Sequence, residues 1–294
     1  MKQFNPFNHS LASSKKLRWL YAIAATGLGL FGSIQNASAN ALPPLPDYIA
    51  QQGKLRVGVK CDYPPAGFLG SDGKPTGVEV DMARHIAQIA FGSPDKIDLQ
   101  CVTSENRIPT LMAKKVDLLL ATLGIFPARQ KVIDFTVPYF WGSSTFLVAK
   151  NSPYQTNAEV LDKKIIVLKG GSQITWLTKN APKAQLIRMN TNSDALQSLR
   201  QGRGDAYTGD VASLINLLPS NPELRMLPLK EQYDVQWGGG GIRKGEPEWK
   251  AYLDVILQDM KTQHFYGPVV DKYVKESVVR DLMVATYETD PPQK

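Results

Sequence analysis

One stretch of the sequence places an arginine between apolar segments. The stretch ATLGIFPARQKVIDFTVPYF, residues 121–140, is apolar at both ends and carries Arg129 near its middle. A guanidinium keeps its charge in a protein, and its planar fork matches a carboxylate. Arg129 is therefore either a solvated helix residue or one positive pole of an anion-binding site.

A candidate negative pole follows much later in the chain. Asp210 ends the short run GDAYTGD, and the helical pattern VASLINLLPS comes next. A free α-amino acid is a zwitterion and needs both poles, because a desolvated charge without a partner is costly. Tyr63 could supply an aromatic wall, and backbone N–H groups near Gly170 and Gly171 could meet a carboxylate. The alternative for Asp210 is a helix N-cap.

The common catalytic motifs are missing from the sequence. The three histidines, His9, His85 and His264, form no H-x-x-x-H pair, and no C-x-x-C pair is present, so we expect no metal site. No G-x-S-x-G elbow occurs, and the GGGG run does not open a phosphate loop. These observations favour binding over catalysis and predict no cofactor.

The N-terminus has the form of a signal peptide. Residues 1–18 carry four basic and no acidic residues, the apolar run WLYAIAATGLGLF follows, and ASA ends at Ala39. We expect cleavage after Ala39, with Ala41 as the second choice; the alternative is a membrane anchor, for which the run is short. Removal of residues 1–39 lowers the formal charge from +7 to +3 (7 − 4). The remaining charges are mixed in sign, which argues against nucleic acid as a partner.

The mature chain alternates strand and helix patterns. The first part of the mature chain shows strand patterns at Lys54–Cys61, 95–102 and 116–124. Between them, apolar residues have helical spacing at Gly77–Ala90 and 106–115. The alternation restarts at 163 after a strand at Ser144–Lys150. We therefore predict an α/β fold of two Rossmann-like lobes joined by two crossover segments. Lobe 1 would comprise residues 40–147 and 240–294, and lobe 2 residues 148–239. We interpret Gly238–Gly241 as a crossing with special backbone dihedrals.

Two cysteines, Cys61 and Cys101, end two apolar runs. In an exported chain thiols oxidise, and neighbouring strands would bring the two sulfurs together at their ends. We expect a disulfide; the alternative is two free buried thiols.

These segments together resemble a known family. The motifs GKLRVGV…DYPPAGF, GVEVDMARHIA, NRIPTLMAKKVDLLLATLGIFPARQ, KKIIVLKGGS and GRGDAYTGD are similar to those of periplasmic amino-acid-binding proteins of ABC importers, the solute-binding family 3. The resemblance runs from about Gly53 to Tyr273 and implies a periplasmic binding protein of type II. It also implies that Arg129 holds the ligand α-carboxylate and Asp210 the α-ammonium. Further ligand contacts implied by the resemblance come from Thr122, Gly124, Ser172 and Tyr63.

The resemblance also points to residues beside the ligand side chain. TSENRIP is similar to a motif of members that bind acidic or amide amino acids, so Ser104 and Arg107 could face the side chain, as could Lys169. The alternative is that Arg107 pairs with Glu105 or caps a surface turn. Gly124, Phe126, Ala128 and Ala66 depart from the residues usual in the family, which leaves the shape of the pocket open.

The resemblance implies a monomeric protein of the periplasm. It would bind a free L-amino acid, with polar, acidic or amide ligands favoured, and deliver it to an inner-membrane ABC permease. The alternative is an enzyme of the same fold, such as a cyclohexadienyl dehydratase. A sensor that presents its ligand to a receptor would have the same sequence features.

Overall fold

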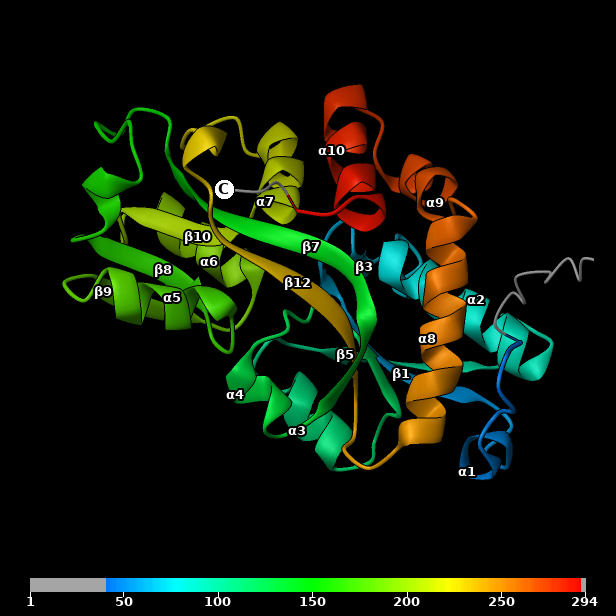
Figure 1. The fold of residues 1–294 in the computed structure, drawn as a ribbon. Coiled ribbons are helices and arrows are strands. Elements are labelled where there is room, and N and C mark those ends of the chain that lie inside the picture. Colours follow the sequence, from blue (N-terminus) through cyan, green and yellow to red (C-terminus); the bar gives the residue numbers. More distant parts are fainter. Residues whose placement is uncertain (1–40, 292–294) are drawn as a thin grey trace, which may run out of the picture. The chain divides into compact units, whose positions relative to one another are not determined.

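The computed structural model describes residues 41–291. Within them one nine-stranded mixed sheet has the order β5-β1-β6-β12-β7-β10-β8-β9, with β11 paired to β7. Figure 1 shows the two long strands β7 and β12 side by side through the middle of the sheet, with helices packed at both ends. The predicted α/β fold is confirmed. The predicted signal peptide, residues 1–39, lies outside the described residues, and none of the described helices is long and apolar enough to cross a membrane.

One end of the sheet is built from parallel strands. Here β1 (Leu55–Lys60) lies between β5 (Ile97–Val102) and β6 (Leu118–Leu120). Its helices are α2 (Val78–Phe91) and α3 (Arg107–Met112), close to the predicted bounds. Smaller elements here are α1 (Asp47–Ala50), β2 (Asp62–Tyr63), β3 (Gly67–Leu69), β4 (Pro75–Thr76) and α4 (Pro127–Gln130).

Three C-terminal helices complete this end, which we call the β1 half. They are α8 (Pro247–Thr262), α9 (Tyr266–Tyr273) and α10 (Ser277–Glu288). Their buried side chains, Trp249 and Tyr266 among them, share one apolar core with β1 and α2. Apolar burial of this kind is the main stabilising term of a fold.

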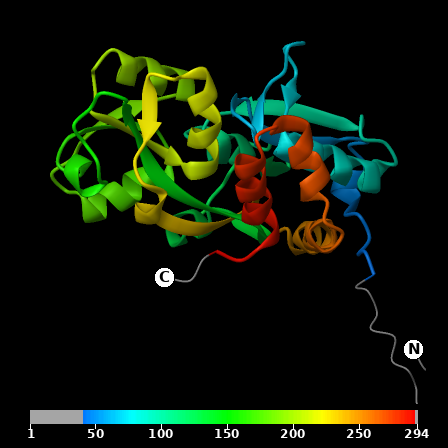
Figure 2. The ribbon, with the colours of Figure 1, turned by 90° about the horizontal axis from the view of Figure 1, so that it is seen from above.

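The other end of the sheet, which we call the β8 half, repeats the alternation. Parallel strands β10 (Ala206–Asp210), β8 (Lys164–Leu168) and β9 (Gln185–Met189) carry helices α5 (Ser172–Asn180), α6 (Asn192–Arg200) and α7 (Val211–Leu217). Further short elements are β11 (Leu224–Met226) and the 3₁₀ turns η1 (Ala158–Val160), η2 (Leu218–Ser220) and η3 (Leu229–Glu231). Figure 2 shows the two halves next to each other, with α10 beside α7.

The antiparallel strands β7 (Asp134–Ala149) and β12 (Tyr233–Ile242) pass from one half to the other. The expectation of special dihedrals in the GGGG run is wrong, because none of these four glycines has a positive φ. The four glycines lie in extended strand, and the lack of room for a side chain explains at least Gly238. A Cβ on Gly238 would lie 1.9 Å from the Phe140 ring, closer than any real Cβ contact.

The predicted disulfide is confirmed. Cys61 and Cys101 are joined, with their Cα atoms 5.5 Å apart. Parallel pairing of β1 with β5 places Val59 opposite Cys101, so Cys61 follows directly beyond the end of its strand. The bond therefore ties two neighbouring strand ends at the edge of the β1 half.

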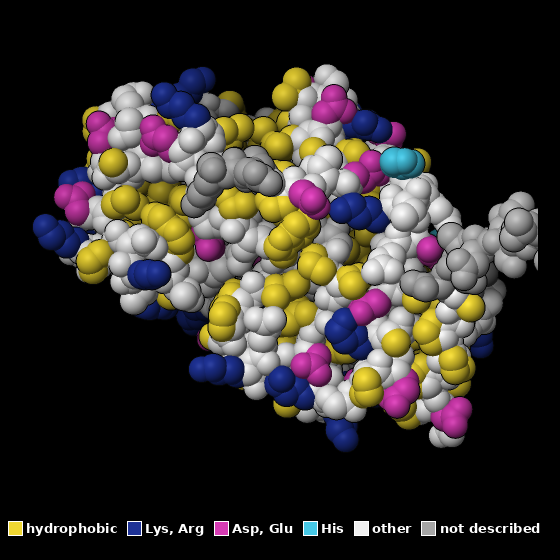
Figure 3. Space-filling model, in the orientation of Figure 1, with side chains coloured by type: hydrophobic (Ala, Val, Ile, Leu, Met, Phe, Trp, Pro, Cys, Tyr) yellow, Lys and Arg dark blue, Asp and Glu magenta, His cyan; other side chains and the backbone are white. Residues whose placement is uncertain are grey.

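Charged side chains of both signs are spread over the surface. Figure 3 shows Lys and Arg interspersed with Asp and Glu on one face, with hydrophobic side chains gathered between α7 and α10.

Candidate ligand-binding cleft

The carboxyl ends of β1, β6, β8 and β10 face one cleft, as expected for open α/β sheets. It encloses about 510 Å³ of empty space, its open mouth included. Eight of the nine residues predicted to bind ligand line it: Tyr63, Ser104, Arg107, Thr122, Gly124, Arg129, Ser172 and Asp210. The predicted residues that the cleft brings together thus lie up to 147 positions apart in the sequence.

Arg129 lies in the short helix α4, which Pro127 begins, and it is 7% exposed. Its Nη1 donates to the Gly124 carbonyl oxygen at 2.8 Å, and its Nη2 donates to the Gly170 carbonyl oxygen at 2.9 Å. The guanidinium also stacks 4.2 Å from the centre of the Phe126 ring. The alternative of a solvated helix residue is therefore wrong. Burial, together with the charge of Arg107, lowers the pKa of Arg129, so an anion nearby would be stabilising.

Asp210 is the last residue of β10 and immediately precedes α7. Its carboxylate makes no hydrogen bond to the first turn of that helix, so the N-cap alternative fails. Instead Oδ2 accepts from the Tyr63 hydroxyl at 2.5 Å, and Oδ1 accepts from Gln173 Nε2 at 3.2 Å. Burial raises the pKa of Asp210, and hydrogen bonding from Tyr63 and the charges of Arg107 and Arg129 offset this in part.

Arg107 is 3% exposed and does not pair with Glu105. Its Nη1 donates to the carbonyl oxygens of Ala121 and Thr122 (3.1 Å for Thr122), while its Nε has no hydrogen-bond partner. Burial lowers the pKa of Arg107, and the charges of Glu79 and Asp210 offset this in part. Arg107 is therefore a second buried cation in the cleft wall.

Lys169 is the one predicted residue that the structure does not bring to the cleft. It lines a separate surface cavity with Arg188, Asp194 and neighbouring residues. The Lys169 N–H donates to the Met189 carbonyl oxygen, so the β8–β9 ladder continues through this residue. Successive side chains of an extended strand point to opposite faces, so Leu168 faces the cleft and Lys169 faces away from it.

Gly124 makes room for a residue that sequence reasoning missed. A Cβ at Gly124 would lie 2.5 Å from the Gln236 carboxamide oxygen, and Gln236 Nε2 donates to Ser172 Oγ at 2.6 Å. Gln236 therefore takes the space of a longer side chain at position 124. The only sequence signal was the small residue at 124, which does not reveal that β12 supplies the filling group.

Glu79 and Gln173 were also missed. Glu79 is fully buried, and its Oε1 accepts from the Thr122 N–H at 2.7 Å and from the Tyr139 hydroxyl. It holds Thr122 in a left-handed conformation, φ 49°, which is uncommon outside glycine. An acid in the apolar stretch GVEV was the available signal for Glu79. Gln173, in the first turn of α5, fixes Asp210.

The charges facing the cleft do not balance. Two buried guanidiniums, Arg107 and Arg129, line the cleft with one half-buried carboxylate, Asp210. Both guanidiniums donate their hydrogen bonds to backbone carbonyl oxygens. A zwitterion would bring one charge of each sign. The remaining positive charge then favours a further acceptor on the ligand.

Comparison with known proteins places this chain in a family. Residues 55–276 match the bacterial extracellular solute-binding proteins, family 3. An ABC transporter glutamine-binding protein of Bacillus subtilis is 28% identical over 257 residues, which cover 86% of this chain and 93% of the relative.

Solved structures agree with this match. The solute receptor for L-cysteine of Neisseria gonorrhoeae superposes with a TM-score of 0.74 and 27% identity, over 83% of this chain and 96% of that one. An ancestral amino acid-binding protein, a precursor of cyclohexadienyl dehydratase, gives a TM-score of 0.70 and 28% identity, over 78% of this chain and 99% of that one. The architecture is that of type II periplasmic binding proteins. With a match over most of its length, the chain belongs to the bacterial extracellular solute-binding proteins, family 3.

Proposed function

We propose that the cleft binds a free L-amino acid. Arg129 holds the α-carboxylate, supported by Thr122, Gly124 and Ser172, and Asp210 holds the α-ammonium. Tyr63 forms a wall beside the bound molecule. The observation that carries this proposal is that two groups of opposite charge line the same cleft: the buried guanidinium of Arg129 in the β1 half and the half-buried carboxylate of Asp210 in the β8 half.

The proposed ligand class follows from the positive charge that remains after Arg129 and Asp210 have bound the α-carboxylate and the α-ammonium. Arg107 and Ser104 both line the cleft, and among the described residues no carboxylate is hydrogen-bonded to the Arg107 guanidinium. An acidic or amide side chain supplies the acceptor that these groups need. Ligands with purely apolar side chains would leave the Arg107 charge without a partner in the cleft, and an unsatisfied buried polar group costs about 1–3 kcal/mol.

Closure of two lobes would enclose the bound ligand in the cleft. We propose lobes of residues 40–147 with 240–294 and of residues 148–239, hinged in β7 and β12. Contacts that link the halves support this: Arg129 to the Gly170 carbonyl, Tyr63 to Asp210, and Asn192 Nδ2 to the Asp62 carbonyl at 2.8 Å. The closed, monomeric protein would pass its ligand to an inner-membrane ABC permease from the periplasm, after signal cleavage.

A thermal-shift screen against the twenty amino acids, followed by calorimetry, tests the proposal. A ligand that binds only the native state raises the unfolding midpoint. Arg129→Met should lower the affinity of the best ligand at least about 100-fold, because a charge-assisted pair is lost. Arg188→Met, at an exposed arginine of β9, should leave it unchanged. Unchanged affinity in folded Arg129→Met would refute the role of Arg129.

An enzyme on this scaffold is the second candidate, favoured by the similarity to a dehydratase precursor. Such chemistry needs a free, positioned acid or base. Asp210 already accepts two hydrogen bonds, and Asp62 forms an ion pair with Lys60 at 2.8 Å. We therefore propose binding without turnover. Formation of product from prephenate or arogenate, in an assay with purified protein, would establish the enzyme instead.

A further inference from the structure

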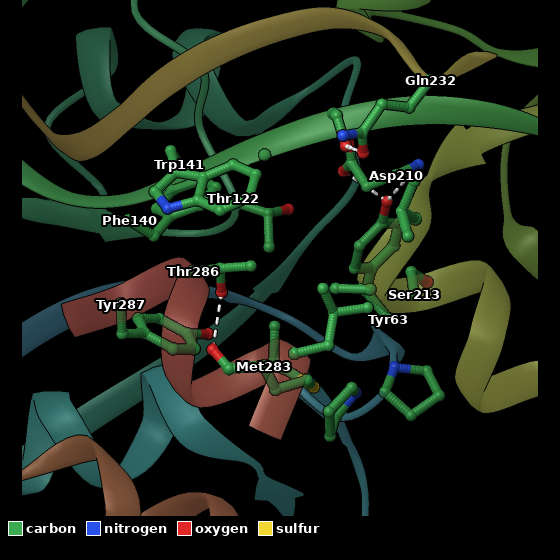
Figure 4. A pocket seen from close by; sticks show the side chains of 18 residues that line it. Tyr63, Thr122, Phe140, Trp141, Asp210, Ser213, Gln232, Met283, Thr286 and Tyr287 are labelled. Carbon is green, nitrogen blue, oxygen red and sulfur yellow. Dashed lines mark hydrogen bonds between the residues drawn. The ribbon is translucent and has the colours of Figure 1, made fainter. Parts of the chain in front are cut away.

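A second cavity lies behind the ligand cleft and shares part of its wall. It encloses about 580 Å³, its mouth included, and Tyr63, Thr122, Phe140, Gly142 and Asp210 line both spaces. Figure 4 shows Tyr63 and Asp210 on one side of this cavity and Trp141, Thr286 and Tyr287 on the other. The amino-acid site described above does not use this space.

Both halves of the molecule contribute walls to this second cavity. Residues 64–66 and α10 belong to the β1 half, and residues 211–213 at the start of α7 belong to the β8 half. The crossing strand β7 supplies residues 140–143. The far wall, formed by Met283, Thr286 and Tyr287 of α10, lies beyond the family match, which ends at residue 276.

The chemistry of the walls indicates what the cavity could hold. Most of the side chains that line it are apolar, including the prolines after Tyr63, the rings of Phe140 and Trp141, and Met283. Two polar atoms on lining residues have no hydrogen-bond partner: Trp141 Nε1 and Ser213 Oγ, on residues 7% and 2% exposed. Unpaired buried polar atoms are uncommon and costly in native proteins. These two atoms have almost no accessible surface, so the apolar side chains decide what the cavity can hold. The walls therefore suit a ring-sized, largely apolar molecule.

The hydrogen bond from the Tyr63 hydroxyl to Asp210 Oδ2 lies between the two spaces. A molecule in the second cavity would contact Tyr63 without reaching Arg129, which lines only the cleft. The two sites would then be separate but would share the residues that hold the ligand ammonium.

We propose that this second cavity binds a small, ring-sized, largely apolar molecule, and that its binding strengthens amino-acid binding in the neighbouring cleft. The coupling would arise because both halves supply walls of the cavity, so a change in the arrangement of the halves would change the cavity. A molecule that binds this arrangement preferentially shifts the population towards it. By linkage, each ligand then raises the affinity of the other by the same factor.

The first experiment measures probe binding without any amino acid. Three fluorinated probes, 4-fluorobenzyl alcohol, 4-fluorophenol and 4-fluorophenylacetate, are titrated by ¹⁹F NMR against the mature protein. We expect saturable binding of at least one probe and a shift of the Trp141 indole N–H signal, which is assigned by its loss in Trp141→Phe. Absence of saturable binding by all three, or binding that leaves this signal unmoved, would overturn the proposal.

The second experiment measures coupling and rests on the proposed function. Calorimetry of the best amino acid is repeated with the bound probe near saturation, and we expect its affinity to rise at least about fivefold. A fall in affinity would show that the probe competes for the cleft, and no change would show uncoupled sites; either result contradicts the proposal. If no amino acid binds at all, the proposed function fails, while the first experiment still decides whether the cavity is a site.

A substitution that fills the second cavity tests whether the probe binds there. Figure 4 shows the Thr286 methyl group directed towards the cavity, so Thr286→Phe should abolish probe binding and coupling while amino-acid binding persists. Val278→Phe, at a position 70% exposed on the same helix, is the matched control. Probe binding by a folded Thr286→Phe would refute the location. If circular dichroism shows that this variant does not fold, the coupling measured on the unmodified protein decides.

Discussion

The Tyr63 hydroxyl donates to Asp210 Oδ2 at 2.5 Å, although 147 positions separate the two residues. The bond joins Tyr63, the last residue of β2 in the β1 half, to Asp210, the last residue of β10 in the β8 half. It also fixes the carboxylate that we assign to the ligand ammonium. Most of the predictions below depend on the charges buried around this contact.

Ligand affinity should fall in acid because of Asp210. Burial raises the pKa of this carboxyl in the ligand-free protein, whereas a bound ammonium favours its charged form. Binding therefore releases a proton, and affinity should drop up to about tenfold per pH unit once the pH falls below the pKa of the free protein. Calorimetry between pH 4 and 8 measures this. Asp210→Asn should bind weakly and lose the pH dependence; a pH dependence retained in that variant would assign it to another group.

The same substitution should stabilise the ligand-free protein at neutral pH. A raised native pKa means that the native state holds the proton more tightly than the unfolded state does. This contribution to stability is fully present below the unfolded pKa of about 3.9 and is lost as the pH rises through the native pKa. At pH 7 the charged Asp210 therefore carries a burial cost that its hydrogen bonds and the two arginines offset only in part, and Asp210→Asn removes it. Urea unfolding should show a higher free energy of unfolding for Asp210→Asn, and a lower one would contradict the burial argument.

Arg107 should set selectivity, whereas Lys169 should not. Loss of a hydrogen bond to a charged group costs about 1.5–3 kcal/mol, so Arg107→Met should reduce the affinity ratio of glutamate over alanine by at least about tenfold. The ratio is the readout because Arg107 also supports the carbonyl oxygens of Ala121 and Thr122. Lys169→Met, in the separate cavity, should change the ratio less than about twofold. Equal effects of the two substitutions would place the ligand side chain elsewhere.

Gly238→Ala should destabilise the crossing of β7 and β12. The added Cβ would lie 1.9 Å from the Phe140 ring, and overpacking of this kind costs about 1–3 kcal/mol. Gly142→Ala is the matched control in the facing strand, because its nearest neighbour would be 3.7 Å away. Chemical denaturation compares the two variants. Phe140→Leu should restore part of the stability lost in Gly238→Ala, and no restoration would mean that another contact causes the loss.

The disulfide should matter for stability more than for ligand selectivity. It closes a loop with a sequence separation of 40 residues, for which the chain-entropy estimate is about 3–4 kcal/mol. The double substitution of Cys61 and Cys101 by serine should lower the free energy of unfolding by about 2–4 kcal/mol. Calorimetry should find the same preferred amino acid, and a changed preference would link the bond to the cleft.

The order of strands and helices and the two charged poles could be read from the sequence alone. Alternating apolar runs set the elements because their spacing matches strand and helix periods, and these runs place Asp210 at a strand end. Arg129 was recognisable because an arginine between apolar segments is costly without a partner. The disulfide followed from two cysteines at strand ends, with free thiols as the alternative.

Only the tertiary structure decided which side chains meet. Lys169 turns away from the cleft because it continues the β9 pairing, whereas Gln236 enters it to fill the space left by Gly124. The four consecutive glycines form a strand beside Phe140, although their local sequence was equally compatible with special dihedrals. The second cavity has no sequence signal of its own, because a cavity is defined by distances between segments that are remote in the chain. Local periodicity determines elements, and packing between those elements determines which faces enclose a site.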